Sequence, residues 1–152
     1  MAFEIRTRRR VEFAETDAAG IVHFSNFLRY MEEVEHAFLR SLGMSVHTAA
    51  VGFPRLGATF EYLSPARFEE ILDIHFWVRR KGRTSLVYNA VFTRGGEEVA
   101  RGEIATIACR VGNGGKLEPV SLPEEAAKGI EEAPYPPVEF RGRREGAGSG
   151  RT

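Results

Sequence analysis

The longest regular pattern in the chain is a stripe of apolar residues between positions 25 and 42. Its members recur at intervals of three and four, which places them on one face of a helix. They are Phe27, Met31, Val34, Phe38 and Leu42, with Leu28 and Leu39 widening the stripe. The rest of the surface is mostly taken by Glu32, Glu33, Glu35 and Arg40. We predict a helix from about Ser25 to Leu42, with Ser25 or Asn26 as the N-terminal cap and Gly43 as the stop.

Beyond this helix the pattern changes to a period of two. Apolar and polar residues alternate over 58–63, 72–79, 85–92 and, less cleanly, 99–107. Such alternation predicts strands, and the links 81–83 and 95–96 predict hairpin turns. A first strand is expected between Phe3 and Ala14, with Val11 and Phe13 on one face. Short links favour antiparallel neighbours, so we predict an α+β fold in which a five-stranded antiparallel sheet wraps one long helix.

Length and composition predict one domain followed by a tail. The chain has 152 residues, 43% of them hydrophobic, which suffices for a single core. We assign this domain to residues 1–140, where three prolines near its end interrupt regular structure. Residues 141–152 are rich in Arg and Gly and are predicted to be flexible. In this tail Arg141, Arg143 and Arg144 either meet the phosphates of a nucleotide-like substrate or are simply solvated.

Charge and cysteine content exclude several classes of protein. The formal net charge is zero, which argues against a nucleic-acid binder. The single cysteine, Cys109, cannot form an internal disulfide and suits the cytoplasm. No stretch is long and apolar enough to predict a membrane span or a signal peptide. Because His36, His47 and His75 lack the spacing of metal ligands, no metal is expected.

Candidate chemistry lies just upstream of the helix. Asp17 precedes Phe24 by seven residues, and Gly20 permits a sharp turn between them. The first N–H groups of a helix have no partner within it, so those near Phe24 can hold an oxyanion beside a carboxylate. This combination suits attack on a carbonyl group. Alternatively, Asp17 only stabilises a loop turn through its side chain.

Two motifs resemble the 4-hydroxybenzoyl-CoA thioesterase family, which includes the YbgC-like acyl-CoA thioesterases. The first motif runs from Glu15 to Glu32, and the second is the stretch Glu61–Arg67, which contains Tyr-Leu-Ser-Pro-Ala-Arg. The residues that match in the first motif are Thr16, Asp17, Gly20, Ile21, Val22, His23, Phe24, Asn26 and Phe27. There are departures at Ala14, at Phe24, where some members carry histidine, and at Phe27, where tyrosine is common.

The resemblance implies a hotdog-fold enzyme that hydrolyses an acyl-CoA thioester. In such an enzyme Asp17 attacks the thioester carbonyl or activates a water, and the backbone N–H of Phe24 polarises that carbonyl. The resemblance also implies an active site shared across a dimer interface, and we expect a homotetramer built from dimers. Coenzyme A enters as part of the substrate, and no other cofactor is expected.

Further residues are candidates for substrate contact, each with a structural alternative. His23 orients water or lines the acyl pocket, or it is an exposed loop residue; Ser25 and Asn26 are expected beside the substrate at the helix start. Arg67 and Arg83, with the basic run Arg79–Lys81, either bind the CoA phosphates or serve solubility. Glu32 or Glu33 is a fallback base, or else part of a solvated helix face or of an interface ion pair. The aromatic candidates line the acyl pocket or simply build the core; they are Phe24, Phe27, Phe53, Phe60 and Trp77.

Two other functions remain open from the sequence. A hotdog hydratase or dehydratase usually needs a histidine with a carboxylate, whereas the motif here centres on Asp17 without a matched histidine. The other alternative is a non-catalytic module that binds acyl chains or a carrier protein. The residues do not define the acyl group, or whether its carrier is CoA or a protein.

Overall fold

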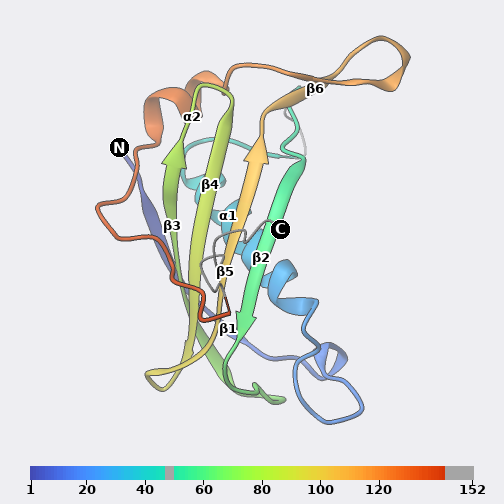
Figure 1. Cartoon of the computed structure of the whole chain (residues 1–152), viewed down its shortest axis with the longest axis vertical. Coiled ribbons are helices and arrows are strands. Elements are labelled where there is room, and N and C mark those ends of the chain that lie inside the picture. Colours follow the sequence, from blue (N-terminus) through green and yellow to red (C-terminus); the bar gives the residue numbers. More distant parts are fainter. Residues whose placement is uncertain (47–49, 143–152) are drawn as a thin grey trace, which may run out of the picture.

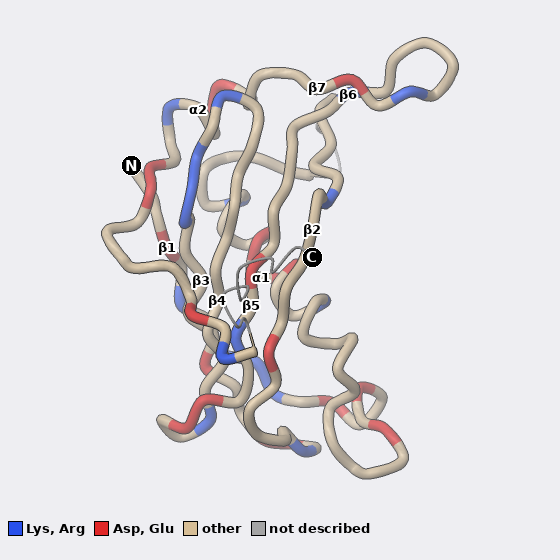
Figure 2. The backbone as a smooth tube through the Cα atoms, in the orientation of Figure 1, with Lys and Arg blue, Asp and Glu red and all other residues tan. Residues whose placement is uncertain are grey.

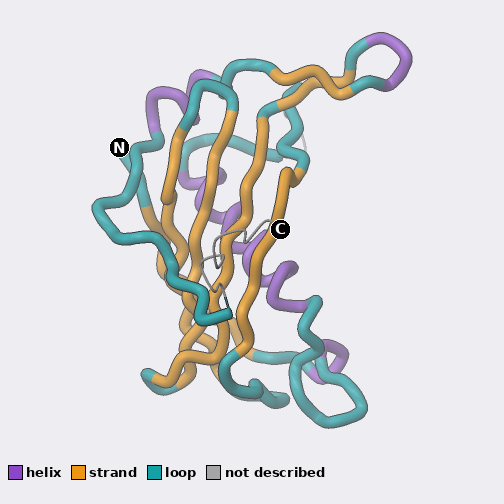
Figure 3. The backbone as a smooth tube through the Cα atoms, in the orientation of Figure 1, coloured by secondary structure: helices purple, strands orange, loops and turns teal. Residues whose placement is uncertain are grey.

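Five strands form one antiparallel sheet that curves around a long helix (Figure 1). The computed structural model describes residues 1–46 and 50–142. The strands lie in the order β1-β3-β4-β5-β2, so β1 and β2 form the edges of the sheet. The strand bounds are β1 Glu4–Arg10, β2 Arg55–Tyr62, β3 Ile71–Lys81, β4 Ser85–Arg94 and β5 Glu97–Ile107. The helix α1, Asn26–Ser41, crosses one face of this sheet (Figure 3).

The core forms between α1 and the inner face of the sheet. Alternate residues of β3 and β4 are buried there because successive side chains of a strand point to opposite faces. These residues are Leu72, Ile74, Phe76 and Val78 on β3 and Leu86, Tyr88, Ala90 and Phe92 on β4. From the helix, Phe38 packs against Phe76 with ring centroids 5.7 Å apart. The predicted α+β class and the hotdog arrangement are confirmed, and the predicted helix is correct to within one residue at each end.

The predicted turn at 95–96 is also confirmed. Gly95 and Gly96 are the only two residues between β4 and β5, and their φ angles are 56° and 86°. Two-residue hairpin turns of the primed types require positive φ, which glycine adopts without steric cost. The two glycines therefore fix the register of the central hairpin.

The first strand ends earlier than predicted. It stops at Arg10, and residues Phe13–Glu15 form a 3-10 turn. Val11 is buried, but Phe13 lies in this turn and is 74% exposed, so the prediction that both lie on one face of a strand is wrong. The chain turns here because the Glu15 carboxylate accepts a hydrogen bond from the backbone N–H of Glu12 at 2.7 Å.

The helix buries a carboxylate that the pattern placed on its polar face. Glu35 is only 4% exposed and accepts two hydrogen bonds from Arg55 on β2, at 2.7 and 2.8 Å. Leu28, predicted to widen the apolar stripe, is exposed, whereas Tyr30 is buried. A charged side chain is tolerated inside when a partner satisfies it, as Arg55 does here.

Three elements toward the C-terminus were not predicted. Strands β6 (Cys109–Val111) and β7 (Leu117–Pro119) form a separate hairpin, and α2 (Glu124–Gly129) follows it. Residues 131–142 then cross the outer face of the sheet without regular structure, as the prolines predict. Val138 N–H donates to the Asn89 side chain on β4, at 2.9 Å.

The predicted domain boundary at residue 140 is not tested and stays a prediction. Contact with the sheet extends to Gly142, whose N–H donates to the Glu61 carboxylate at 3.2 Å. His47, Arg143 and Arg144 lie outside the described residues. Within residues 1–46 and 50–142, no helix is long and apolar enough to cross a membrane.

Candidate active site

A small looped hairpin positions Asp17. Thr16 and Val22 form an antiparallel bridge, and Asp17 N–H donates to the carbonyl of Ile21 at 2.8 Å. The Gly20 N–H closes the turn onto the Asp17 carbonyl at 2.9 Å. Gly20 has a φ of 77°, which L-residues with a side chain rarely adopt. The glycine therefore allows the fold-back that the sequence suggested.

Glu15 fastens this loop to the start of α1. Its backbone carbonyl accepts hydrogen bonds from the Asn26 side-chain amide at 2.8 Å and from His23 N–H at 2.9 Å. Its carboxylate is held by Arg9 and by the hydroxyl of Tyr30, at 2.7 and 2.9 Å. Burial and this carboxylate raise the pKa of Tyr30, so the phenol remains a neutral donor. The role of Glu15 as an anchor could not be read from the sequence because its partners lie on three separate elements.

The start of α1 has no side-chain cap. The Ser25 hydroxyl lies 2.7 Å from His23 Nδ1, and the Asn26 amide binds Glu15, so neither residue caps the helix as predicted. Asn26 N–H and Phe27 N–H donate to the carbonyls of His23 and Phe24, at 2.9 and 3.3 Å. The Phe24 N–H has no acceptor among the described residues. An uncapped helix start leaves such donors for a ligand.

A cavity of about 490 Å³ joins Asp17 to this helix start. Its volume lies within the usual range for small-molecule sites, and its lining is largely apolar. The lining residues are Asp17, Ile21, Val22, Phe24, Phe27, Tyr62, Leu63, Ser64, Pro65 and Ala66. The second sequence motif therefore forms one wall of the cavity and the first motif the other.

Tyr62 connects the two walls. Its hydroxyl donates to the Phe24 carbonyl at 3.1 Å, and its ring packs edge-on against the Phe24 ring. Burial raises the pKa of Tyr62, which keeps the phenol protonated as a donor. The sequence placed Tyr62 only within a strand-ending motif, because its contact with residue 24 spans 38 positions.

The Asp17 carboxylate has one anchored oxygen. Oδ1 accepts hydrogen bonds from Ala19 N–H at 2.8 Å and Ile21 N–H at 3.4 Å. Oδ2 has no hydrogen-bond partner among residues 1–46 and 50–142. The turn-stabilising role and a chemical role are therefore compatible, since one oxygen holds the loop while the other remains available.

Other expected contact residues lie in different surroundings. His23 is exposed and does not line the cavity, and Ser25 is its hydrogen-bond neighbour. Glu32 and Glu33 are in ion pairs with Arg55 and Arg9 of the same chain, at 3.5 and 2.8 Å, and neither lines the cavity.

The basic residues do not form one group within the chain. Arg67 is exposed and pairs through its backbone with Ile21, beside the cavity. Arg83 lies in the β3–β4 turn at the opposite end of the sheet in Figure 1, where it donates to Ser121 at 3.0 Å. The run Arg79–Lys81 ends β3 near the same turn (Figure 2). Of the basic residues expected to bind CoA, Arg67 is the one whose position the structure places beside the cavity, while Arg94, which was not predicted, donates to the cavity residue Ser64 at 3.2 Å.

The aromatic candidates also divide. Phe24 and Phe27 line the cavity, whereas Phe53 packs against the core. Phe60 stacks against Tyr62 rather than lining the cavity itself. Trp77 lies on the outer face of the sheet, beside His75.

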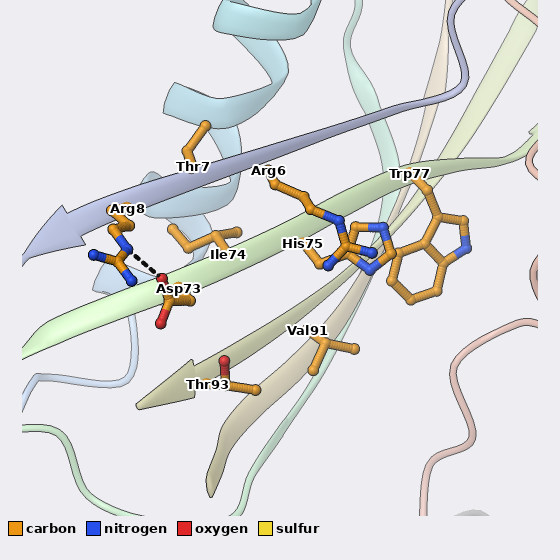
Figure 4. A pocket seen from close by; sticks show the side chains of 9 residues that line it. All are labelled: Arg6, Thr7, Arg8, Asp73, Ile74, His75, Trp77, Val91 and Thr93. Atoms are coloured by element: carbon orange, nitrogen blue, oxygen red, sulfur yellow. Dashed lines mark hydrogen bonds and ion pairs between the residues drawn. The ribbon is translucent and has the colours of Figure 1, made fainter. Parts of the chain in front are cut away.

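A larger hollow of about 630 Å³ lies over β1, β3 and β4 (Figure 4). Its ionisable side chains already have partners: Arg8 pairs with Asp73 at 2.8 Å, and Arg6 and His75 lie 3.9 and 2.6 Å from the Glu4 carboxylate. Burial alone would raise the pKa of Glu4, but hydrogen bonds from His75 and Tyr135 lower it overall. This hollow therefore offers a less suitable place for thioester chemistry than the Asp17 cavity.

In the part of the chain that the structure describes, no three His, Cys, Asp or Glu side chains gather as metal ligands. The expectation that the protein needs no metal remains a prediction.

Replacing Gly20 by alanine tests the turn. The position has open space for a methyl group, so only the backbone conformation opposes the change. We expect Gly20→Ala to lower the free energy of unfolding by about 1 kcal/mol. Gly52→Ala is the matched control because Gly52 also has open space but no positive φ. Equal stability of the two variants in chemical denaturation would contradict the role assigned to Gly20.

Comparison with known proteins identifies the family. Residues 11–130 match the model of the thioesterase-like superfamily. A putative esterase from Aquifex aeolicus (strain VF5) is 36% identical over 121 residues, which cover 78% of this chain and 91% of that protein.

Two solved structures support the same assignment. A hypothetical protein from Aquifex aeolicus has a TM-score of 0.75 and 30% identity, and the match covers 84% of this chain and 99% of that protein. The gentisyl-coenzyme A thioesterase BH1999 has a TM-score of 0.73 and 28% identity, and the match covers 81% of this chain and 99% of that protein. The chain therefore belongs to the thioesterase-like superfamily, hotdog-fold enzymes that hydrolyse thioesters.

Proposed function

We propose that this chain hydrolyses an acyl- or aroyl-CoA thioester to the free acid and CoA. The observation that carries the proposal is the shared cavity, in which the Asp17 carboxylate and the uncapped start of α1 line the same space. Support also comes from the similar gentisyl-coenzyme A thioesterase, which acts on an aroyl-CoA according to its name.

In this proposal the Phe24 N–H polarises the thioester carbonyl. The carbonyl oxygen accepts that hydrogen bond and gains negative charge as the carbonyl carbon is attacked. One such donor is typically worth about 3 kcal/mol of activation free energy. Tyr62 assists by holding the Phe24 carbonyl, and the apolar walls formed by Phe24 and Phe27 receive the acyl group.

Asp17 supplies the attacking or activating oxygen, by one of two routes. As a nucleophile, its Oδ2 bonds to the carbonyl carbon while the C–S bond breaks and CoA leaves as a thiolate, which takes a proton from water. A second water then hydrolyses the acyl-enzyme anhydride. As a general base, Asp17 instead removes a proton from a water molecule, whose oxygen bonds to the carbonyl carbon; the C–S bond then breaks, and the CoA thiolate takes up the proton that Asp17 removed.

A thiol-release assay over a panel of aromatic and aliphatic acyl-CoAs tests this function. We expect release of free CoA that depends on Asp17, with the preferred acyl group identified by kcat/KM. Reversible addition of water to an enoyl-CoA without thiol release would support a hydratase instead. Binding of acyl-CoA or of an acyl carrier protein without turnover would identify a binding module.

We also propose that the protein assembles through the edge of β2. The other edge strand, β1, carries four arginines; Arg8 and Arg9 are held in ion pairs within the chain, but the exposed Arg6 and Arg10 still disfavour pairing of two such edges. The exposed part of β2, Leu56–Ala58, carries no charge and leaves room for a second strand. Two-fold pairing of β2 would give a dimer, and two dimers would give the expected homotetramer.

Light scattering after size exclusion checks this assembly. We expect a dimer or tetramer at micromolar concentration, and a monomer would contradict the proposal. Ala58→Lys, which places a charge on the β2 edge, should shift the protein toward monomer. Thr93→Lys, on the outer face of β4, is the control that should leave the mass of the oligomer unchanged.

The buried free thiol of Cys109 suits a reducing compartment, so we propose a cytoplasmic location.

A further inference from the structure

The β6–β7 hairpin projects from the body of the molecule past the edge strand β2 (Figure 1). Its base is held by paired hydrogen bonds between Cys109 and Gly52, at 2.8 and 2.9 Å. Gly52 lies three residues before β2 begins, so the hairpin leaves the fold beside the start of that strand. We call residues 109–119 the arm.

One face of the arm is apolar and open to solvent. Val111 and Leu117 are opposite each other in the register and are 71% and 57% exposed. The neighbouring pair, Arg110 and Glu118, lies on the other face, with a 3.7 Å ion pair. A two-stranded hairpin is only marginally stable in water without an apolar face packed against something. An exposed Val–Leu pair on such an element therefore indicates a surface that it covers.

The cavity near Asp17 has a matching open side. Phe24 and Tyr62, which line it, are 60% and 45% exposed. Both lie at the far end of β2 from the arm, because the arm leaves near Arg55 and the cavity begins at Tyr62. Within one chain the arm and the cavity are thus at opposite ends of the same edge strand.

A two-fold axis at the β2 edge, as proposed above, would bring them together. Antiparallel pairing sets the start of β2 in one copy beside the end of β2 in the other. The arm is about 15 Å long from base to tip, or roughly three strand spacings, so it reaches across the edge of the second copy. In such a dimer the arm would lie where the second copy's cavity opens.

We propose that the arm of each copy closes the Asp17 cavity of its two-fold partner, with Val111 and Leu117 completing the apolar wall around the acyl group. This inference rests on the proposed thioesterase function and on assembly through β2. The active site is then incomplete in a single chain, and the arm takes part in selecting the acyl group.

Paired substitutions on the two faces of the arm test this role. Val111→Ser with Leu117→Ser should lower kcat/KM at least about 10-fold, mainly through KM, because apolar contact with the acyl chain is lost. Arg110→Ser with Glu118→Ser, on the other face, should change it by less than about 3-fold. All four side chains are exposed within the single chain, so neither pair of substitutions should disturb the fold of the subunit itself. A shortened arm, with 111–117 replaced by Asn-Gly, gives a second test should the serine variant misfold.

Complementation distinguishes an arm that acts on the partner from one that acts on its own chain. Subunits carrying Asp17→Asn and subunits carrying the two arm serines are co-expressed with different tags, and the mixed oligomers are isolated. Each mixed pair then contains one site with both an intact Asp17 and an intact arm, so activity should recover to about half of wild type.

Three results would overturn the arm proposal: no recovery in the mixed oligomers, equal activity of the two paired arm variants, or a monomer in light scattering. Undiminished activity of Asp17→Asn alone would instead contradict the catalytic proposal. In that case the difference in kcat/KM between the two paired serine variants of the arm still decides whether the arm is part of the site.

Discussion

Asp17→Asn is expected to lower turnover at least about 100-fold, the lower range for the loss of an acid–base group. Asparagine keeps a side-chain oxygen that can accept the hydrogen bond from Ala19 N–H, so the turn around Gly20 should persist. What the variant loses is the charge, and with it the nucleophile or base. The measurement is steady-state release of CoA at saturating substrate, together with a melting curve that shows an intact fold.

The chain offers a matched control for this substitution. Asp73, the only other aspartate in the sequence, lies on the outer face of β3 and pairs with Arg8 at 2.8 Å. Asp73→Asn should leave turnover within about 2-fold of wild type, since an exposed ion pair contributes little even to stability. Near-normal turnover in Asp17→Asn would remove Asp17 from the mechanism.

The largest effect on stability is expected from Arg55→Met. This substitution removes the partner of Glu35, whose side chain is 5% exposed and would remain as a buried carboxylate without its cation. Breaking a buried pair in this way typically costs about 3–5 kcal/mol of unfolding free energy. Because Arg55 itself is partly exposed, we expect the lower end of that range, about 3 kcal/mol, in chemical denaturation.

Two further variants test the explanation. Glu32 is exposed and lies 3.5 Å from the same guanidinium. The substitution Glu32→Gln should therefore lower the free energy of unfolding by less than about 1 kcal/mol. The double variant Glu35→Leu with Arg55→Met should recover most of the lost stability, because an apolar pair can replace a buried ion pair. A double variant as unstable as Arg55→Met would show that the charge left behind is not the cause.

The residue pattern was sufficient to predict the helix and all five strands of the main sheet, although the first strand ends earlier than predicted. These elements bury one regular face, so spacing alone reveals them. The errors occur where tertiary partners override the pattern: Glu35 is buried because Arg55 reaches it from β2, and β1 stops at Arg10 because Glu15 caps the next turn. The arm has only three residues in each strand, too few for an alternation to be recognised.

The site was predictable to the extent that it is local in sequence. Asp17, Gly20 and Phe24 lie within eight consecutive residues, and the glycine signalled the turn that brings them to one cavity. The contribution of Tyr62 depends on the path of β2 and could not be read from spacing. The prediction that Arg67 and Arg83 act together also depended on distances through the fold, and one chain holds them at opposite ends of the sheet.

The most direct test of the central claim is a crystal structure of the Asp17→Asn variant with a non-hydrolysable acyl-CoA thioether ketone. We predict that the ketone oxygen accepts a hydrogen bond from Phe24 N–H at about 2.7–3.1 Å, with the side chain of residue 17 facing the carbonyl carbon. A ligand whose carbonyl is bound elsewhere, far from both groups, would contradict the account.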